Sequence, residues 1–152
     1  GVIIDAFGPE HQAFDLPIVD GLSAPKPGPG VQADDVRAAL AARVVSALRA
    51  KPELAKRLSQ MDVSDPHNAR VRLVGDQALL ILGEDQFLQR LESYLQIAGT
   101  LRASVPDIDY VDLRFGERVF VGPAGKTKKT PVAVPAGRVS DDARRRGGAR
   151  QR

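Results

Sequence analysis

The chain has 152 residues, of which 43% are hydrophobic and 27% charged, so it can form one domain with a core and is short for two. It has no cysteine, which excludes disulfides, thiolate metal sites and thiol catalysis. No apolar run approaches the roughly 20 residues of a membrane-spanning helix. Because the chain begins at Gly1 inside a strand-like pattern, we expect a fragment, so that any membrane anchor or targeting segment would lie upstream.

Charge is distributed unevenly along the chain. The net charge is +3, but residues 126–152 contain nine basic and two acidic residues and carry +7. Residues 1–125 therefore carry −4. The sequence predicts a mildly acidic body followed by a strongly basic tail.

The first 30 residues predict strands and a loop. Residues 2–4 form an apolar run, and residues 12–16 could return as its antiparallel partner. We expect residues 17–22 to leave the strand. Three prolines and two glycines in residues 25–30 then predict a loop.

A first helix should start at Asp34 or Asp35, either of which can cap it. Hydrophobic residues recur every fourth position and predict one buried stripe. Its members are Val36, Leu40, Val44 and Leu48. Pro52 should end or kink this helix, and residues 53–58 could add a short turn.

Three strands and a second helix should follow. Residues 59–65 and 70–74 alternate apolar and polar side chains, which predicts two strands with one wet face each. Residues 78–82 are apolar throughout and predict a central strand. Glu84 and Asp85 should cap an amphipathic helix that runs to about Ala103.

Residues 109–121 predict a hairpin with two possible registers. A two-residue loop, Gly116 and Glu117, pairs Phe115 with Arg118. A three-residue loop, residues 116–118, instead pairs Phe115 with Val119. We prefer the longer loop because it places five apolar side chains on one face. They are Val111, Leu113, Phe115, Val119 and Val121.

The hairpin should lie at an open sheet edge. Residues 127–152 show no periodicity and are rich in Pro, Gly, Ala and Arg, so we expect them to be disordered. The last strand, residues 118–121, would then present unpaired backbone groups to another chain. Tyr110, Arg114 and Phe120 would share the opposite face to the five apolar side chains.

Motifs for catalysis or metal binding are weak. His11 and His67 lie in predicted turns, without further ligands or an orienting carboxylate at a defined spacing. No serine lies in a Gly-x-Ser-x-Gly elbow, and residues 122–127 lack the first glycine of a phosphate-binding loop. We therefore predict no catalytic residues, no metal site, no cofactor and no small-molecule substrate.

The basic tail supports a second hypothesis. Its charge could bind nucleic acid or anionic lipid electrostatically. Because no aromatic residue follows Phe120, base stacking is not available to it, and nucleic-acid binding is the weaker option.

Several segments, in order, resemble the bacterial cell-division protein family FtsQ, also called DivIB. The resemblance covers about residues 1–122. It rests on Val2–Asp5, Leu16–Leu22, Met61–Pro66, Gly83–Phe87 and the hairpin segment Tyr110–Phe115.

The resemblance implies a single-pass protein of the cytoplasmic (inner) membrane, with this domain on the periplasmic side. It implies a non-enzymatic scaffold that recruits FtsB and FtsL during septum formation, with a partner strand adding to the last strand. The family's transmembrane helix and POTRA domain are absent from residues 1–152. A hairpin arginine that assists binding in the family corresponds to Arg114, and the following aromatic residue to Phe115.

The sequence therefore predicts an α+β domain, residues 1–122, with a mixed, largely antiparallel sheet of about six strands. Two main helices should pack on the sheet, and residues 123–152 should form a disordered basic tail. The predicted partner-binding residues are Tyr110, Arg114, Phe115, Arg118, Val119, Phe120 and Val121.

Overall fold

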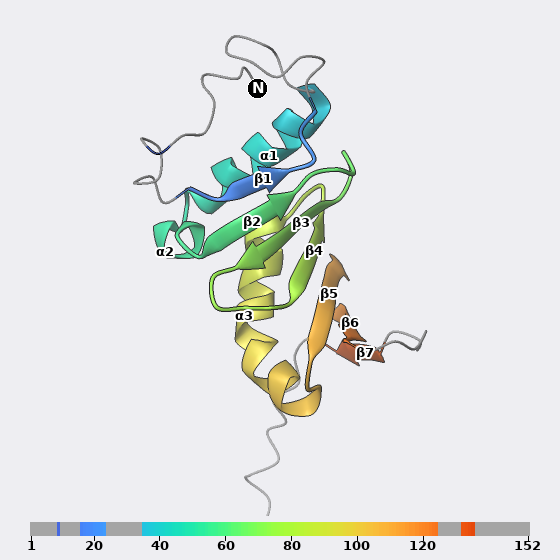
Figure 1. Cartoon of the computed structure of the whole chain (residues 1–152). Coiled ribbons are helices and arrows are strands. Elements are labelled where there is room, and N and C mark those ends of the chain that lie inside the picture. The colour runs from blue at the N-terminus through green and yellow to red at the C-terminus, as the bar shows by residue number, and fades with distance from the viewer. Residues whose placement is uncertain (1–8, 10–15, 24–34, 125–131, 136–152) are drawn as a thin grey trace, which may run out of the picture.

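The structure is a computed structural model that describes residues 9, 16–23, 35–124 and 132–135. It contains a seven-stranded sheet in the order β1-β2-β3-β4-β5-β6-β7 (Figure 1). β1 pairs with β2, and β4 with β5, in parallel, and the other neighbours are antiparallel. The prediction of an α+β domain with a mixed, largely antiparallel sheet is confirmed.

Ten elements make up the described residues. The strands are β1 (Ile18–Asp20), β2 (Leu58–Asp62), β3 (Ala69–Leu73), β4 (Leu79–Gly83), β5 (Ile108–Phe115), β6 (Arg118–Pro123) and β7 (Val132–Pro135). The helices are α1 (Asp35–Leu48), α2 (Pro52–Ala55) and α3 (Phe87–Ser104). α1 and α3 are the two main helices that the sequence predicts.

The first strand differs from the prediction. Residues 2–4, and all of residues 12–16 except Leu16, lie outside the described residues. β1 instead forms within residues 17–22, which we expected to leave the strand, because it pairs in parallel with β2. Gly21 has φ +88° at its end, and a Cβ there would lie 2.3 Å from the Ser64 backbone nitrogen. This close approach requires glycine.

The core lies between the two main helices and one face of the sheet. In the register of the strands, one buried side chain from each of five neighbouring strands forms a row across the sheet. The row is Met61, Val71, Leu80, Val111 and Val121. The α1 stripe is buried at Leu40, Val44 and Leu48 but not at Val36 in the first turn, which is 59% exposed.

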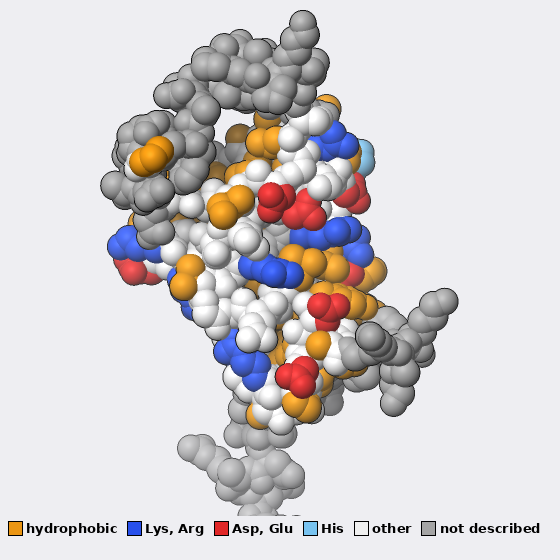
Figure 2. All heavy atoms as spheres, viewed as in Figure 1, with side chains coloured by type: hydrophobic (Ala, Val, Ile, Leu, Met, Phe, Trp, Pro, Cys, Tyr) orange, Lys and Arg blue, Asp and Glu red, His pale blue; other side chains and the backbone are white. Residues whose placement is uncertain are grey.

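The other face of the sheet is not covered by a described helix. A parallel row on that face joins Asp62, Arg70, Ile81, Asp112 and Phe120 in register. Figure 2, which views this face, shows hydrophobic, basic and acidic side chains interspersed on it. Such a mixed surface is typical of a solvated sheet face, so the sheet is buried on one side only.

The start of α3 is built differently from the prediction. Its N-cap is Gln86, with φ 51° and no side-chain cap. Asp85 instead forms an ion pair with Arg90, whose Nη2 lies 2.7 Å from Asp85 Oδ1. Glu84 binds His67 at 3.0 Å. Asp85 and Glu84 therefore form contacts with side chains near this helix end and do not cap the helix.

Tyr94, in α3, anchors the helix to the turn between β3 and β4. Its hydroxyl donates a hydrogen bond of 2.6 Å to Asp76 Oδ2, which also binds Arg102 at 2.7 Å. Burial and the hydrogen bond to Asp76 raise the pKa of Tyr94 to about 12. Burial of Asp76 raises the pKa of that carboxyl, but the bonds from Tyr94, the Ala78 amide and Arg102 outweigh it, and the pKa is lowered.

We expect Tyr94→Phe to lower the free energy of unfolding at pH 7 by about 1–2 kcal/mol, because Asp76 loses a donor. In the unfolded chain Tyr94 has the ordinary tyrosine pKa of 10.0, whereas in the folded one its pKa is about 12. The unfolded state therefore loses its proton first, and the Tyr94 contribution is lost as pH rises from 10 to 12. Urea unfolding of both proteins at pH 7 and 11 measures this. Between pH 7 and pH 11 the unchanged protein should lose more free energy of unfolding than the phenylalanine variant. If both proteins lost the same amount, the assignment would be contradicted.

Candidate protein-interaction site

The turn of the β5–β6 hairpin contains two residues, not three. Phe115 pairs with Arg118, and the register shifts between Asp112 and Phe115. The three-residue loop that we preferred is therefore wrong. Gly116 has φ +62° at the first turn position, a conformation for which glycine is favoured in two-residue hairpin turns.

This shorter turn changes which hairpin side chains are buried. Four of the five predicted apolar residues are at most 3% exposed, namely Val111, Leu113, Val119 and Val121. Phe115 is 54% exposed, so the prediction that it joins them is wrong. The register shift before the turn is the reason, because it breaks the alternation of faces.

Phe115 and its neighbours form a small exposed cluster. The ring of Phe115 lies 4.9 Å from the ring of Phe120 in a T-shaped arrangement. The guanidinium carbon of Arg114 lies 5.6 Å from the Phe115 ring centroid. We call Arg114, Phe115 and Phe120 the hairpin cluster. A planar cation beside two rings is a composition enriched in protein-binding surfaces.

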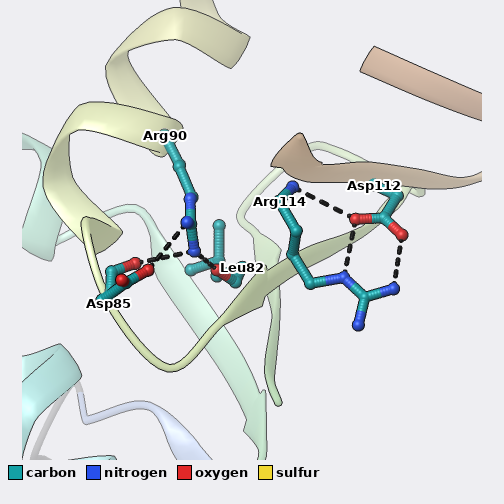
Figure 3. A network of polar contacts seen from close by, with 5 residues as sticks. All are labelled: Leu82, Asp85, Arg90, Asp112 and Arg114. Carbon is teal, nitrogen blue, oxygen red and sulfur yellow. Dashed lines mark hydrogen bonds and ion pairs between the residues drawn. The ribbon is translucent and has the colours of Figure 1, made fainter. Parts of the chain in front are cut away.

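Arg114 is held by a carboxylate two positions earlier on the same strand. Its Nε and Nη2 donate to Asp112 Oδ1 and Oδ2 at 2.9 and 2.7 Å, and the Arg114 amide donates to Oδ1 at 3.2 Å (Figure 3). The hydrogen bond to Asp112 raises the pKa of Arg114. Asp112 is 7% exposed, so this two-pronged contact supplies hydrogen bonds to a carboxylate that has little access to water.

The hairpin also approaches the end of β4, where Arg114 and Arg90 both lie close to Gly83. A Cβ on Gly83 would lie 3.0 Å from Nη1 of Arg90 and 3.2 Å from Cγ of Arg114, so this glycine sits between the two arginines. Arg90 donates to the carbonyls of Leu82 and Asp85 (Figure 3). The end of β4 thus braces the side chain of Arg114 at the edge of the open sheet face.

β6 is not a free edge in this structure. β7 pairs with it antiparallel over four residue pairs, from Arg118 with Pro135 to Val121 with Val132. The prediction that residues 118–121 form the open edge is therefore wrong, and the disorder that we expected for residues 127–152 does not hold for Val132–Pro135. Residues 125–131 and 136–152 lie outside the described residues. A short segment that looks structureless alone can form a strand once a partner strand supplies its hydrogen bonds.

The seven predicted partner-binding residues fall into two groups. The side chains of Val119 and Val121 are buried in the core, so these residues can offer only backbone to a partner. The other five are at least partly exposed: Tyr110, Arg114, Phe115, Arg118 and Phe120. Gly122 lies opposite Tyr110, and a Cβ there would lie 2.1 Å from the Tyr110 ring, so this ring covers the end of β6.

Asp112 is the site residue that sequence reasoning missed. It lies two positions before Arg114, and residues at that spacing share a face of a strand, so their contact could have been predicted from the sequence.

The described residues show no cluster of metal ligands around the histidine that they include. His67 contacts Glu84. Among the described residues, no three His, Asp or Glu side chains are grouped as metal ligands.

The described residues form an α+β domain whose sheet end carries an exposed hairpin. Residues 1–114 match the family model described as cell division protein FtsQ/DivIB, C-terminal. The chain belongs to this family, which has a role in cell division and is a scaffold family not known for catalysis.

A curated relative supports the same family. The cell division protein FtsQ of Koribacter versatilis (strain Ellin345) is 27% identical over 139 residues, which is 90% of this chain and 39% of the relative. The chain thus spans about two fifths of the length of the relative it matches. No solved structure shows a significant match. None of the described helices has the length and hydrophobicity needed to cross a bilayer.

Proposed function

We propose that this domain is a non-enzymatic scaffold that recruits FtsB-like and FtsL-like proteins to the division site. The partner strand adds to the outer edge of β6. The domain acts on the extracytoplasmic side of the cytoplasmic membrane, held by an anchor upstream of residue 1. Membership of the FtsQ/DivIB family supports the division role.

The pairing of β7 with β6 is the observation that carries the mode of binding. An antiparallel strand fits along residues Arg118–Val121 without a bulge in the register. A β6 edge that accepts a strand of the same chain has the spacing and twist to accept one from a partner. The buried side chains of Val119 and Val121 fix the backbone of β6 for this purpose.

The hairpin cluster supplies side chains next to that edge. Phe120 lies on β6 itself, and Phe115 and Arg114 lie on β5 just before the turn. Because backbone hydrogen bonds are similar for every sequence, side chains beside the edge must select the partner. An exposed aromatic ring and a guanidinium held by Asp112 are suited to this role.

We expect Phe115→Ser to weaken binding of the cognate FtsB-like segment at least about tenfold, since one aromatic anchor is worth about 1.4 kcal/mol or more. The stability of the variant domain should change little, because the Phe115 ring is 54% exposed. Isothermal titration calorimetry with the purified domain measures the affinity.

Ile18→Ser is the matched control. Ile18 is 59% exposed and lies on β1, at the opposite edge of the sheet. Its replacement should leave the affinity unchanged. Equal affinities of the Phe115 variant and the unchanged domain, or a loss caused only by the Ile18 variant, would refute docking at the hairpin.

A further inference from the structure

We propose that β7 is a built-in competitor that occupies the β6 edge and must leave before a partner strand can add. This inference rests on the proposed function of β6 and assigns a regulation to it. It follows from the position, the length and the tether of β7.

The position of β7 coincides with the predicted docking strand. Its four residues pair with Arg118, Val119, Phe120 and Val121, which are the β6 residues of the candidate site. One edge of a strand has a single row of amides and carbonyls, so it can pair with only one neighbour. A partner strand and β7 therefore exclude each other along this stretch.

The length of β7 makes it replaceable. The pairing of β5 with β6 extends from Ile108 opposite Pro123 to Phe115 opposite Arg118. The pairing of β7 with β6 covers only four residue pairs, and β7 ends in Pro135. Proline has no amide hydrogen and cannot donate to a ladder. Pro131 precedes β7 in the sequence and restricts its extension at the other end. A longer partner strand can form more backbone bonds than β7 does.

The tether keeps β7 close to β6. Residues 124–131 join the end of β6 to the start of β7. A connection of this length gives the tethered strand an effective concentration on the order of millimolar, so weak pairing still occupies the edge. The apparent affinity for a partner is the intrinsic affinity multiplied by the fraction of molecules in which the edge is open. Loss of β7 pairing should therefore raise that affinity.

The test is the affinity for the cognate FtsB-like segment of a domain with Ala133→Pro and Val134→Pro. Amides of successive strand residues point to opposite sides, so the two changes together remove whichever one faces β6. The control carries Arg138→Pro and Val139→Pro, beyond β7. We expect at least about tenfold tighter binding for the first variant. The control should bind as the unchanged domain does.

The outcomes separate this inference from the proposed function. Equal or weaker binding by the Ala133/Val134 variant, with binding still sensitive to Phe115→Ser, overturns the competitor role of β7 and leaves docking at the hairpin intact. Absence of binding by every variant and by the unchanged domain overturns the proposed function and this inference with it.

Discussion

Replacing Arg114 by glutamate is expected to weaken binding of the FtsB-like segment at least about 100-fold and to lower the free energy of unfolding by about 2–3 kcal/mol. Both effects have one origin. Asp112 is 7% exposed, and its carboxylate receives two hydrogen bonds from the guanidinium of Arg114. Glutamate removes both donors and places a second negative charge beside Asp112.

The loss of binding has an additional cause. Arg114 lies beside the Phe115 ring, so glutamate also removes the cation from the hairpin cluster. The affinity is measured by calorimetry, and the stability of the same samples by urea unfolding at pH 7. Binding should be measured well below the unfolding midpoint, so that the two effects are read separately.

Arg72→Glu is the charge-matched control. Arg72 is exposed on the same open face, on β3, where it pairs with Gln60 in register. The change in net charge is identical, but no hairpin contact is lost. If both variants lost affinity to the same degree, a general charge effect would explain the result, and the role assigned to Arg114 would be wrong.

Leu80→Ala is expected to lower the free energy of unfolding by about 3 kcal/mol, the largest effect on stability that we predict for a single apolar substitution. Leu80 is fully buried in the central strand, between Val71 and Val111 in register. α3 packs on this part of the sheet, so a cavity there cannot readily be refilled. Urea unfolding measures the difference.

Leu79→Ala tests the orientation of the same strand. Leu79 lies one position earlier and therefore on the open face, opposite Tyr110. Its side chain is half-buried, so the same chemical change should lower the free energy of unfolding by only about 1 kcal/mol. A larger loss for Leu79 than for Leu80 would mean that the faces of β4 are assigned the wrong way round.

The elements predicted well from the sequence are those whose signal is local. β4 is an apolar run, and α3 has hydrophobic residues at helical spacing. In both, the local pattern of hydrophobic residues indicates which side chains are buried. α1 was predicted for the same reason, although Val36 in its first turn proved exposed. Helix and central-strand patterns therefore gave the framework of the domain.

The elements that were missed depend on partners distant in the sequence. β1 has three residues and pairs with β2 some 40 residues later, and β7 has four residues, of which the last is a proline. Neither contains enough alternation to be distinguished from a loop. Their strand conformation comes from the edge on which they pair, which no local pattern records.

The candidate site was predicted in part. The position of the hairpin followed from the apolar pattern of its strands, but a one-residue register shift moved Phe115 to the surface. Such a shift leaves no mark in composition. The spacing of Asp112 and Arg114 in the sequence allows their contact. The structure adds that the Asp112 carboxylate is buried, which makes its hydrogen bonds from Arg114 matter for stability.

Amide hydrogen exchange in β6 tests the central claim most directly. In the Ala133→Pro, Val134→Pro domain, the outward-facing amides of residues 118–122 should exchange rapidly, and a saturating FtsB-like segment should slow them at least about tenfold. The buried amides that face β5 should change little and serve as an internal reference. Saturation by the partner with unchanged exchange along β6 would show that recruitment occurs at another surface and would contradict the account.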